Sequence, residues 1–275
     1  MEDGSVQLTQ EAYIRDLLNQ FQLSEVKDAD TPMESKPNFL DEKVNATEED
    51  FPYRELIGKL MYLALRTRPD ITFAVSKLAQ YCSKYSKAHW TAAKRILRYL
   101  KATISFGLLY KKTGDKLAAF ADADWATCRE SRKSMTGYVI TLAGHPIIWK
   151  TTKQKAVALS TMEAEYVALA NCARDVSWVR ELLVQFGQGK FVDGPTTIWC
   201  DNQSAISHAK NFVDKPTTKH IGIKYHFIRE KMVQGAIGLK YVRTQENIAD
   251  GFTKPLPGPA YSKYQERVVW RRDQE

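Results

Sequence analysis

Four acidic residues, Asp122, Glu165, Asp201 and Asp250, stand along the chain at places where predicted strands end or predicted helices begin. Hard Mg²⁺ ions require oxygen ligands, and two such ions about 4 Å apart activate a water and stabilise the leaving oxygen of a phosphodiester. Without metal, two carboxylates 4 Å apart repel each other by about 4 kcal/mol at an effective dielectric of about 20. Together the four acids therefore predict the site of a two-metal nuclease.

Two of the acids follow predicted strands. Asp122 comes near the end of an apolar run that begins at Leu117, as expected where a buried strand reaches the surface. Asp201 follows the strand-like segment 196–200 and precedes a predicted helix that begins at Asn202. Open α/β sheets place ligands at such turns from strand to helix. We therefore expect both carboxylates at one edge of a sheet.

A third acid comes from a predicted helix that starts after Ser160 or Thr161 and runs to about Phe186. Glu163 and Glu165 both lie in its first turns. Two residues apart on a helix, they project about 200° from each other, so they cannot both face one metal site, and the other glutamate is expected at the surface. The spacing leaves both glutamates open as the ligand.

The fourth acid, Asp250, lies in a predicted short helix for which Asn247 is the candidate cap. A strand-like segment, 237–243, comes before it. A strand followed by an acid at the start of a helix thus occurs twice in the chain.

The first hundred residues have a different pattern. Apolar residues recur at helical spacing over 53–66 and 70–101, which predicts a mainly helical domain. Residues 27–50 are poor in large apolar side chains and are predicted to form a loop. A turn signal at 113–115 marks the expected boundary with the strand-rich region that holds the acids. With 275 residues the chain is long enough for two modest cores.

The net charge of +8 indicates an anionic partner. Residues 202–245 hold eight Lys and Arg against two acids, and a nucleic-acid backbone could lie along such a stripe. Lys153 and Lys155, at a turn before the glutamate-bearing helix, are better candidates for phosphate contacts. The four cysteines show neither disulfide nor zinc spacing, and no apolar run reaches 18 residues. We therefore expect no metal thiolate site and no membrane span.

Several phrases occur in one order between residues 116 and 256: Phe120-Ala-Asp-Ala-Asp-Trp-Ala126, Ser134-Met-Thr-Gly-Tyr138, Val157-Ala-Leu-Ser-Thr-Met-Glu-Ala-Glu-Tyr166, Trp199-Cys-Asp-Asn-Gln-Ser-Ala205, Lys219-His-Ile221 and Ala249-Asp-Gly-Phe-Thr-Lys-Pro255. Together they resemble the ribonuclease H domain of copia-type LTR retrotransposon Pol polyproteins. The resemblance implies an α/β fold with a ribonuclease H-like mixed five-stranded sheet flanked by helices. It also implies cleavage of the RNA strand of RNA/DNA hybrids with two Mg²⁺ ions, for which Mn²⁺ can substitute.

Carried over residue by residue, the resemblance makes Asp122, Glu165, Asp201 and Asp250 the catalytic metal ligands. The glutamate of this fold tends to have Ala three residues on, which favours Glu165 because Ala168 follows it. Glu163 remains the reserve candidate. The candidate nucleic-acid contacts are Lys153, Lys155, Asn202, Lys219 and Arg229.

Upstream phrases resemble the part of reverse transcriptase that follows the palm: Tyr53-Arg-Glu-Leu-Ile-Gly-Lys-Leu-Met-Tyr-Leu63, Thr67-Arg-Pro-Asp-Ile71 and Lys94-Arg-Ile-Leu-Arg-Tyr-Leu100. The Tyr-x-Asp-Asp motif of the polymerase is absent from the sequence, so this chain alone is not expected to polymerise. The predicted organisation is a thumb- or connection-like remnant of reverse transcriptase over 1–112, a ribonuclease H-like domain over 113–258 and a tail over 259–275. The expected partners are an RNA/DNA hybrid and the rest of Pol, inside the cell, either in a cytoplasmic virus-like particle or in the nucleus.

Two other functions remain open. The first is a catalytically silent nucleic-acid-binding remnant of Pol, including a host-adopted one. It would keep the fold, and Gly222 and Thr127 are departures from the family pattern in that direction. The second is a strand-transfer enzyme of the integrase kind, in which the catalytic Glu follows the second Asp. Here Glu165 precedes Asp201, so the chain order argues against it.

Overall fold

The computed structural model describes residues 4–37, 51–126, 131–210 and 222–271. The chain divides into two compact units. The first is built from Met1–Tyr110 together with Pro255–Glu275, and the second is Lys111–Lys254. The second unit is therefore inserted, in the sequence, between two parts of the first.

The first unit is mainly helical, as the apolar spacing predicts. Its helix α4 (Lys87–Ala102) begins at a capping box between Ser86 and His89, and its buried face carries Ala93, Ile96, Leu97 and Leu100. The strands β1 and β2 pair antiparallel. The other elements before the second unit are β1 (Val6–Leu8), α1 (Glu11–Gln20), α2 (Tyr53–Arg66), η1 (Pro69–Ile71), α3 (Thr72–Ala79) and β2 (Leu108–Tyr110).

The helix α8 (Gly258–Val268) also belongs to the first unit. The range 259–275, which the sequence analysis assigns to a tail, includes most of α8, and this helix buries Tyr261, Tyr264 and Val268. The hydroxyls of Tyr261 and Tyr264 donate to the backbone oxygens of Asp70 and Pro69, both at 3.2 Å. The buried face of α8 is thus built largely from hydrogen-bonded tyrosines, which a search for aliphatic periodicity does not find.

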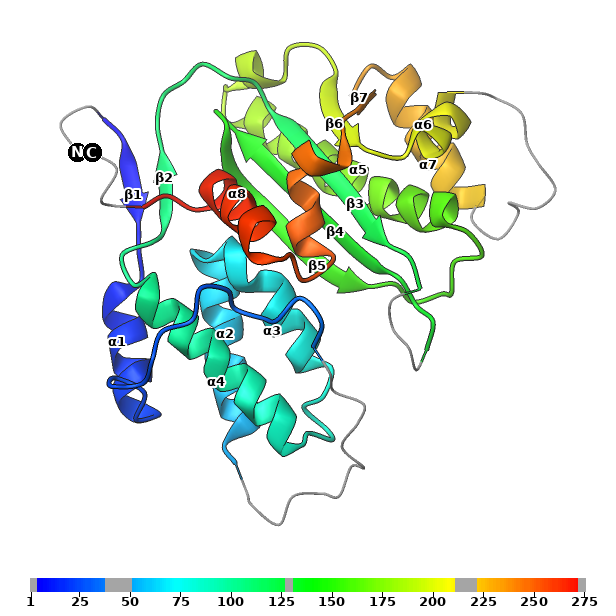
Figure 1. Ribbon diagram of the computed structural model, residues 1–275. Coiled ribbons are helices and arrows are strands. Elements are labelled where there is room, and N and C mark those ends of the chain that lie inside the picture. The colour runs from blue at the N-terminus through cyan, green and yellow to red at the C-terminus, as the bar shows by residue number, and fades with distance from the viewer. Residues whose placement is uncertain (1–3, 38–50, 127–130, 211–221, 272–275) are drawn as a thin grey trace. The chain divides into compact units, whose positions relative to one another are not determined.

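The second unit contains a mixed sheet. Its strands, in spatial order, are β5 (His145–Lys153), β4 (Met135–Leu142), β3 (Ala118–Asp124), β6 (Thr196–Cys200) and β7 (Ile237–Tyr241). β3 is antiparallel to β4 and parallel to β6, while β4 is antiparallel to β5 and β6 is parallel to β7. The predicted α/β fold with a mixed five-stranded sheet flanked by helices is confirmed in the part of the chain that the structure describes (Figure 1).

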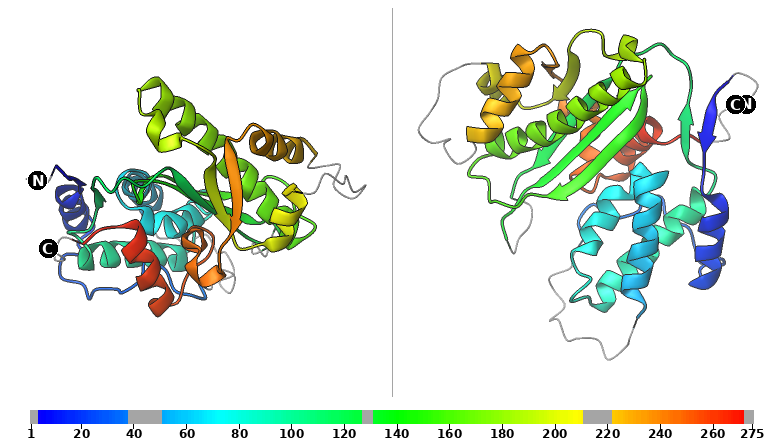
Figure 2. Two further views of the ribbon diagram at one scale, coloured as in Figure 1. Left: turned by 90° about the horizontal axis from the view of Figure 1, so that it is seen from above. Right: turned by 180° about the vertical axis from the view of Figure 1, so that it is seen from behind.

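One face of this sheet is covered by α5 (Thr161–Gln185), with α6 (Gln203–Lys210) and α7 (Gly222–Val233) beside it (Figure 2). The helix α5 packs closely because β3 offers it small, fully buried side chains, Ala119 and Ala121. Two short 3₁₀ helices, η2 (Gly189–Val192) and η4 (Thr244–Glu246), lie in connections. No helix in the described parts of the chain is both long and apolar enough to cross a bilayer.

The 3₁₀ helix η5 (Ile248–Phe252) packs on the other face. Asp122, Gly137 and Thr151 are register partners across β3, β4 and β5, and successive strand residues point to opposite faces. The Thr151 hydroxyl donates to the backbone oxygen of Phe252 at 2.7 Å. A Cβ at Gly137 would lie 2.6 Å from Cγ2 of Thr253, so only glycine lets this segment rest on β4.

Candidate metal centre

The predicted acids gather at one edge of the sheet, where β3 and β6 end. Asp122 lies in β3 and is only 3% exposed, and Asp201 directly follows β6. Because β3 and β6 are parallel neighbours, their carboxyl ends meet at the same edge. β4, on the other side of β3, runs in the opposite direction. Strand-to-helix turns at the carboxyl ends of such strands are where open α/β sheets bind ligands.

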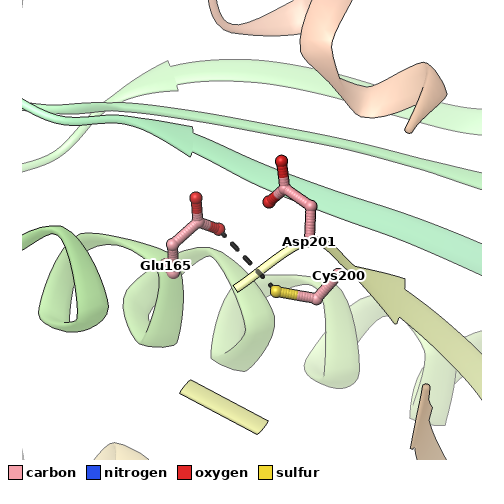
Figure 3. A group of neighbouring side chains, drawn as sticks. All are labelled: Glu165, Cys200 and Asp201. Carbon is pink, nitrogen blue, oxygen red and sulfur yellow. Dashed lines mark hydrogen bonds between the residues drawn. The ribbon is translucent and has the colours of Figure 1, made fainter. Parts of the chain in front are cut away.

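Helical segments bring the other two acids to this edge. Asp250 comes from η5 and Glu165 from the first turns of α5. One oxygen each from Asp122, Asp201 and Asp250 lies within 4.8 Å of the others. Glu165, Cys200 and Asp201 form a second group, whose ligand atoms also lie within 4.8 Å of one another. Asp201 therefore belongs to both groups. Figure 3 shows the carboxylates of Glu165 and Asp201 directed to the same side, with the Cys200 thiol beside Glu165. We call Asp122, Glu165, Asp201 and Asp250 the acid cluster.

Neighbouring side chains hold η5 against β3. The Thr253 hydroxyl donates to the carboxylate of Asp122. The Asn247 amide donates to the backbone oxygen of Ala121 at 3.1 Å, and its Oδ1 caps η5 by accepting from Ala249 at 3.1 Å. Asn247 precedes Asp250 in the sequence and Thr253 follows it. The segment that carries Asp250 is therefore hydrogen-bonded to β3 at both of its ends.

Burial and mutual repulsion raise the pKa values of three carboxyls of the acid cluster, those of Asp122, Glu165 and Asp250. Burial first, and then the charge of Asp250, raises the pKa of Asp122 to about 7. Burial first, and then the charges of Asp122 and Asp201, raises the pKa of Glu165 to about 10. Burial also raises the pKa of Asp250, although Lys254, whose Nζ lies 3.0 Å from Asp250 Oδ2, opposes this shift. Without a bound cation, Glu165 therefore retains its proton at neutral pH and Asp122 is protonated in part.

The donor set fits a hard divalent cation. Four carboxylates supply only oxygen, which is the ligand atom that Mg²⁺ prefers. Oδ1 of Asp250 is buried and has no hydrogen-bond partner in the described part of the chain. A buried polar atom without a partner is uncommon and calls for a ligand. A cation between the carboxylates would satisfy this oxygen and lower the raised pKa values.

Glu165, not Glu163, joins the acid cluster. The Ser160 hydroxyl accepts from the backbone of Glu163 at 3.2 Å, and the carboxylate of Glu163 accepts from the backbone of Leu159 at 2.8 Å. Glu163 therefore belongs to the cap of α5. The sequence predicts that the second glutamate lies at the surface, and this is wrong, because Glu163 is 5% exposed. The cap gives the carboxylate a buried partner that helical projection alone does not reveal.

Cys200 is the sulfur-containing neighbour of the acid cluster. Its fully buried Sγ donates to Oε2 of Glu165 at 3.9 Å and accepts from the backbone of Asn202 at 3.3 Å. Burial, and then the charge of Glu165, raises the pKa of this thiol. Cys200 is therefore a neutral hydrogen-bonding group in the metal-free protein.

Two of the predicted nucleic-acid contacts line a basic groove. Lys153 and Lys155 border an open cavity of about 530 Å³ formed by β4, β5, α5 and α7. Glu163 is the one acid among the described residues that line it. The groove also receives three further cations, Lys150, Arg174 and Lys224. Its charge is complementary to a phosphate backbone.

The other three predicted contacts have different surroundings. Asn202, next to the acid cluster, caps α6 by accepting from the backbone of Ala205 at 2.9 Å. Arg229 is buried and donates to the backbone oxygen of His208 at 3.3 Å. The guanidinium therefore has a protein partner inside the fold, and a contact between Arg229 and nucleic acid stays a prediction. Lys219 lies outside the described residues.

Three residues of the site were not predicted from the sequence. Thr253 and Lys254 follow Asp250 by three and four residues, and helical spacing could have placed both beside it. Gly137 lies opposite Asp122 on the neighbouring strand. No local signal reveals this pairing, because it depends on the register between β3 and β4.

Similarity to known proteins extends over almost the whole chain, although no family model matches it. The chain is 37% identical over 262 residues to the Pol polyprotein from transposon RE2 of Arabidopsis thaliana. It is 36% identical over 271 residues to the Pol polyprotein from transposon TNT 1-94 of Nicotiana tabacum. Each match covers 95% of this chain, which spans 18% and 20% of the two relatives. Among solved structures, LC11-RNase H1, isolated from compost, matches 54% of this chain and 97% of its own, with 19% identity and a TM-score of 0.39. Over 95% of its length the chain is thus similar to copia-type retrotransposon Pol polyproteins.

Proposed function

We propose that the unit Lys111–Lys254 is a ribonuclease H that hydrolyses the RNA strand of RNA/DNA hybrids as part of a retrotransposon reverse transcriptase. The observation that carries this proposal is the convergence of Asp122, Asp201 and Asp250 at the ends of β3 and β6, with ligand oxygens within 4.8 Å of one another. Four segments of a long sequence supply the acid cluster, which is difficult to explain as a solvated surface.

Asp122, Glu165, Asp201 and Asp250 would hold two Mg²⁺ ions, for which Mn²⁺ can substitute. When bound, such ions supply a water of lowered pKa and stabilise the developing charge on the leaving oxygen. The residues of the chain prepare the site for them. Thr253 orients the Asp122 carboxylate, and Lys254, whose pKa is raised by Asp122 and Asp250 against the effect of burial, remains a cation beside the cluster.

The basic groove supports a nucleic acid as the substrate. Lys153 and Lys155 would contact phosphates beside the residue that is cleaved, while Asn202 lies next to Asp201 in the sequence. Selectivity for RNA in the cleaved strand would depend on the 2′-hydroxyl and on the groove width of the hybrid. A bound duplex of this kind releases counterions, so its affinity would fall steeply with salt.

We infer a different role for the residues before the nuclease unit. Residues 1–112 correspond to the part of reverse transcriptase that follows the palm, and 113–258 to the ribonuclease H-like domain. Similarity to a Pol polyprotein over 95% of the chain and the mainly helical structure of the first unit support this division. The chain spans only 18–20% of the length of these relatives. The remainder of Pol is therefore the expected partner.

A panel of end-labelled substrates tests the proposal. The purified chain is incubated in Mg²⁺ with an RNA/DNA hybrid, a DNA duplex, an RNA duplex and single-stranded RNA, with EDTA as the control. We expect metal-dependent cleavage of RNA in the hybrid alone, leaving 3′-hydroxyl and 5′-phosphate ends. Cleavage of both strands, or of the DNA duplex, would contradict the assignment. Binding without cleavage would favour a catalytically silent remnant instead.

A further inference from the structure

An exposed aromatic ring lies beside the acid cluster. Trp125 follows β3 by one residue and is 44% exposed. Its indole N–H donates to the backbone oxygen of Ala158 at 3.1 Å. The polar edge of the ring is thus anchored to the protein while much of the apolar surface remains accessible. Trp125 is therefore not a core residue.

Two further exposed apolar side chains lie next to Ala158 in the sequence. Val157 and Leu159 flank Ala158, the hydrogen-bond partner of Trp125, and are 45% and 74% exposed. Their loop has a defined conformation, because the backbone N–H of Leu159 donates to Glu163 at 2.8 Å. We call Trp125, Val157 and Leu159 the Trp125 patch.

The Trp125 patch is close to the acid cluster. Ala158 packs in a small core with Ala123 and Ala164. These two alanines are the chain neighbours of Asp122 and Glu165. Three residues of extended chain span at most about 11 Å, which limits the separation of the Asp122 and Trp125 Cα atoms. This distance corresponds to about three nucleotide steps at about 3.4 Å each.

The surroundings of the Trp125 patch favour a nucleotide as its ligand. Lys155, in the same loop, is exposed and lines the basic groove. In proteins that bind nucleic acids, aromatic rings next to cationic grooves contact nucleotides while the cations contact phosphates. A stable protein interface needs about 1,000 Å² of buried surface, which three side chains do not supply.

We propose that Trp125 contacts the substrate directly and packs against a sugar of the RNA strand, within about three nucleotides of the cleaved phosphate. Val157 and Leu159 exclude water from the edge of this contact. The inference rests on the proposed function, since it identifies how the same site holds its substrate. It differs from a structural role for Trp125, in which the indole N–H would only position the loop through Ala158.

Steady-state cleavage of an RNA/DNA hybrid by the full chain separates these roles. We expect Trp125→Ala to raise KM about tenfold with little change in kcat, since the contact between the ring and one nucleotide is lost. Trp125→Phe removes the indole donor but keeps an aromatic face, so its KM stays close to that of the unchanged chain. Trp178→Ala is the matched control, because Trp178 is 57% exposed on the later part of α5. Its KM is expected to be unchanged.

Two results would overturn the inference: an unchanged KM for Trp125→Ala, or a rise in KM for Trp125→Phe as large as that for Trp125→Ala. Thermal unfolding and Mn²⁺ titration of each variant show whether the fold and the acid cluster are retained. If Trp125→Ala fails to fold, photo-cross-linking of the unchanged chain decides. An RNA strand with 4-thiouridine within three nucleotides of the cleaved phosphate is expected to cross-link to Trp125, and cross-links confined to other residues would refute the contact.

The proposed function and this inference fail in different ways. A chain that cleaves no hybrid in Mg²⁺ or Mn²⁺ refutes the nuclease assignment. Cross-linking of a hybrid bound in Ca²⁺ still tests the Trp125 contact in that case. A chain that cleaves the hybrid with a KM independent of Trp125 refutes only the inference.

Discussion

The Thr253 hydroxyl donates a hydrogen bond to the carboxylate of Asp122, although 131 residues separate the two in the sequence. Thr253 is buried, and its Oγ1 also lies 3.0 Å from the backbone oxygen of Asp250. One side chain thus joins the strand that carries the first acid to the 3₁₀ helix that carries the last. Within the acid cluster, Thr253 therefore links the segments that carry Asp122 and Asp250.

Replacing Thr253 by Val keeps its shape and removes the donor. We expect Thr253→Val to lower kcat about tenfold, because Asp122 loses its orienting bond. The free energy of unfolding is expected to fall by about 1 kcal/mol. Hybrid cleavage and urea denaturation measure the two effects. Thr253→Ser keeps the hydroxyl and serves as the control, and full activity of Thr253→Val would show that the bond does not position Asp122.

Gly137 controls how closely η5 approaches the sheet. A Cβ added there would lie 2.6 Å from Thr253 Cγ2 and 2.8 Å from Phe252 Cβ. We expect Gly137→Ala to displace η5, to destabilise the unit by about 1–3 kcal/mol and to weaken Mn²⁺ binding measured by calorimetry. Gly238→Ala in β7 is the matched control, since its Cβ would meet its nearest atom, in Pro195, at 3.8 Å. Equal Mn²⁺ affinities for the two variants would contradict this prediction.

The metal-free protein is expected to lose stability as pH rises. The folded-state pKa values of Asp122 and Glu165, about 7 and about 10, lie above the ordinary carboxyl values, so the folded state binds more protons than the unfolded state. The stability that this proton binding contributes is fully present at pH values below the ordinary carboxyl pKa values. It is lost as the pH rises through the raised pKa values of Asp122 and Glu165. In EDTA we therefore expect a lower Tm at pH 8 than at pH 6.

Added Mg²⁺ is expected to restore the Tm at pH 8, because a cation favours the ionised carboxylates. Differential scanning calorimetry at both pH values, with and without Mg²⁺, makes the comparison. Asp122→Asn is expected to reduce the pH dependence. If the Tm in EDTA is the same at pH 6 and pH 8, the pKa values of Asp122 and Glu165 are not raised in the folded protein, and the prediction is wrong.

The basic groove predicts how salt affects hybrid binding. Lys153→Glu combined with Lys155→Glu is expected to weaken binding and to reduce the slope of log affinity against log salt by about 2, one unit for each lost phosphate contact. Lys116→Glu is a suitable control, because Lys116 is exposed and pairs with Asp193 at 3.7 Å, away from the groove lining. Fluorescence anisotropy across a salt series measures the slope. Identical slopes in the double variant and the unchanged chain would exclude both lysines as contacts.

Much of the second unit could be predicted from the sequence, because its acids lie at points where local patterns change. The strand before Asp201, the long helix that carries Glu165 and the cap at Asn247 all have local signals. The mixed five-stranded sheet followed from the resemblance to the Pol family. The fold class is confirmed by the structure, and the resemblance to Pol polyproteins is confirmed by the relatives.

Other features depend on contacts between distant segments, which local patterns do not report. Glu163 is buried because it caps α5, and helical projection alone placed it at the surface. Arg229 reads as part of a basic stripe, but it is turned inward against His208. The close approach of Thr253 to Gly137 depends on the register between β3 and β4 and on the path of the chain after β7.

The most direct test of the metal centre is the cleavage of an end-labelled RNA/DNA hybrid in Mg²⁺ by the unchanged chain, Asp122→Asn and Asp193→Asn. Asp193 is an exposed aspartate before β6, at the opposite end of that strand from Asp201, and its variant is the control. We predict RNA cleavage by the unchanged chain and by Asp193→Asn that EDTA abolishes, and no cleavage by Asp122→Asn. Undiminished cleavage by Asp122→Asn, or cleavage that persists in EDTA, would contradict a nuclease built on these four acids.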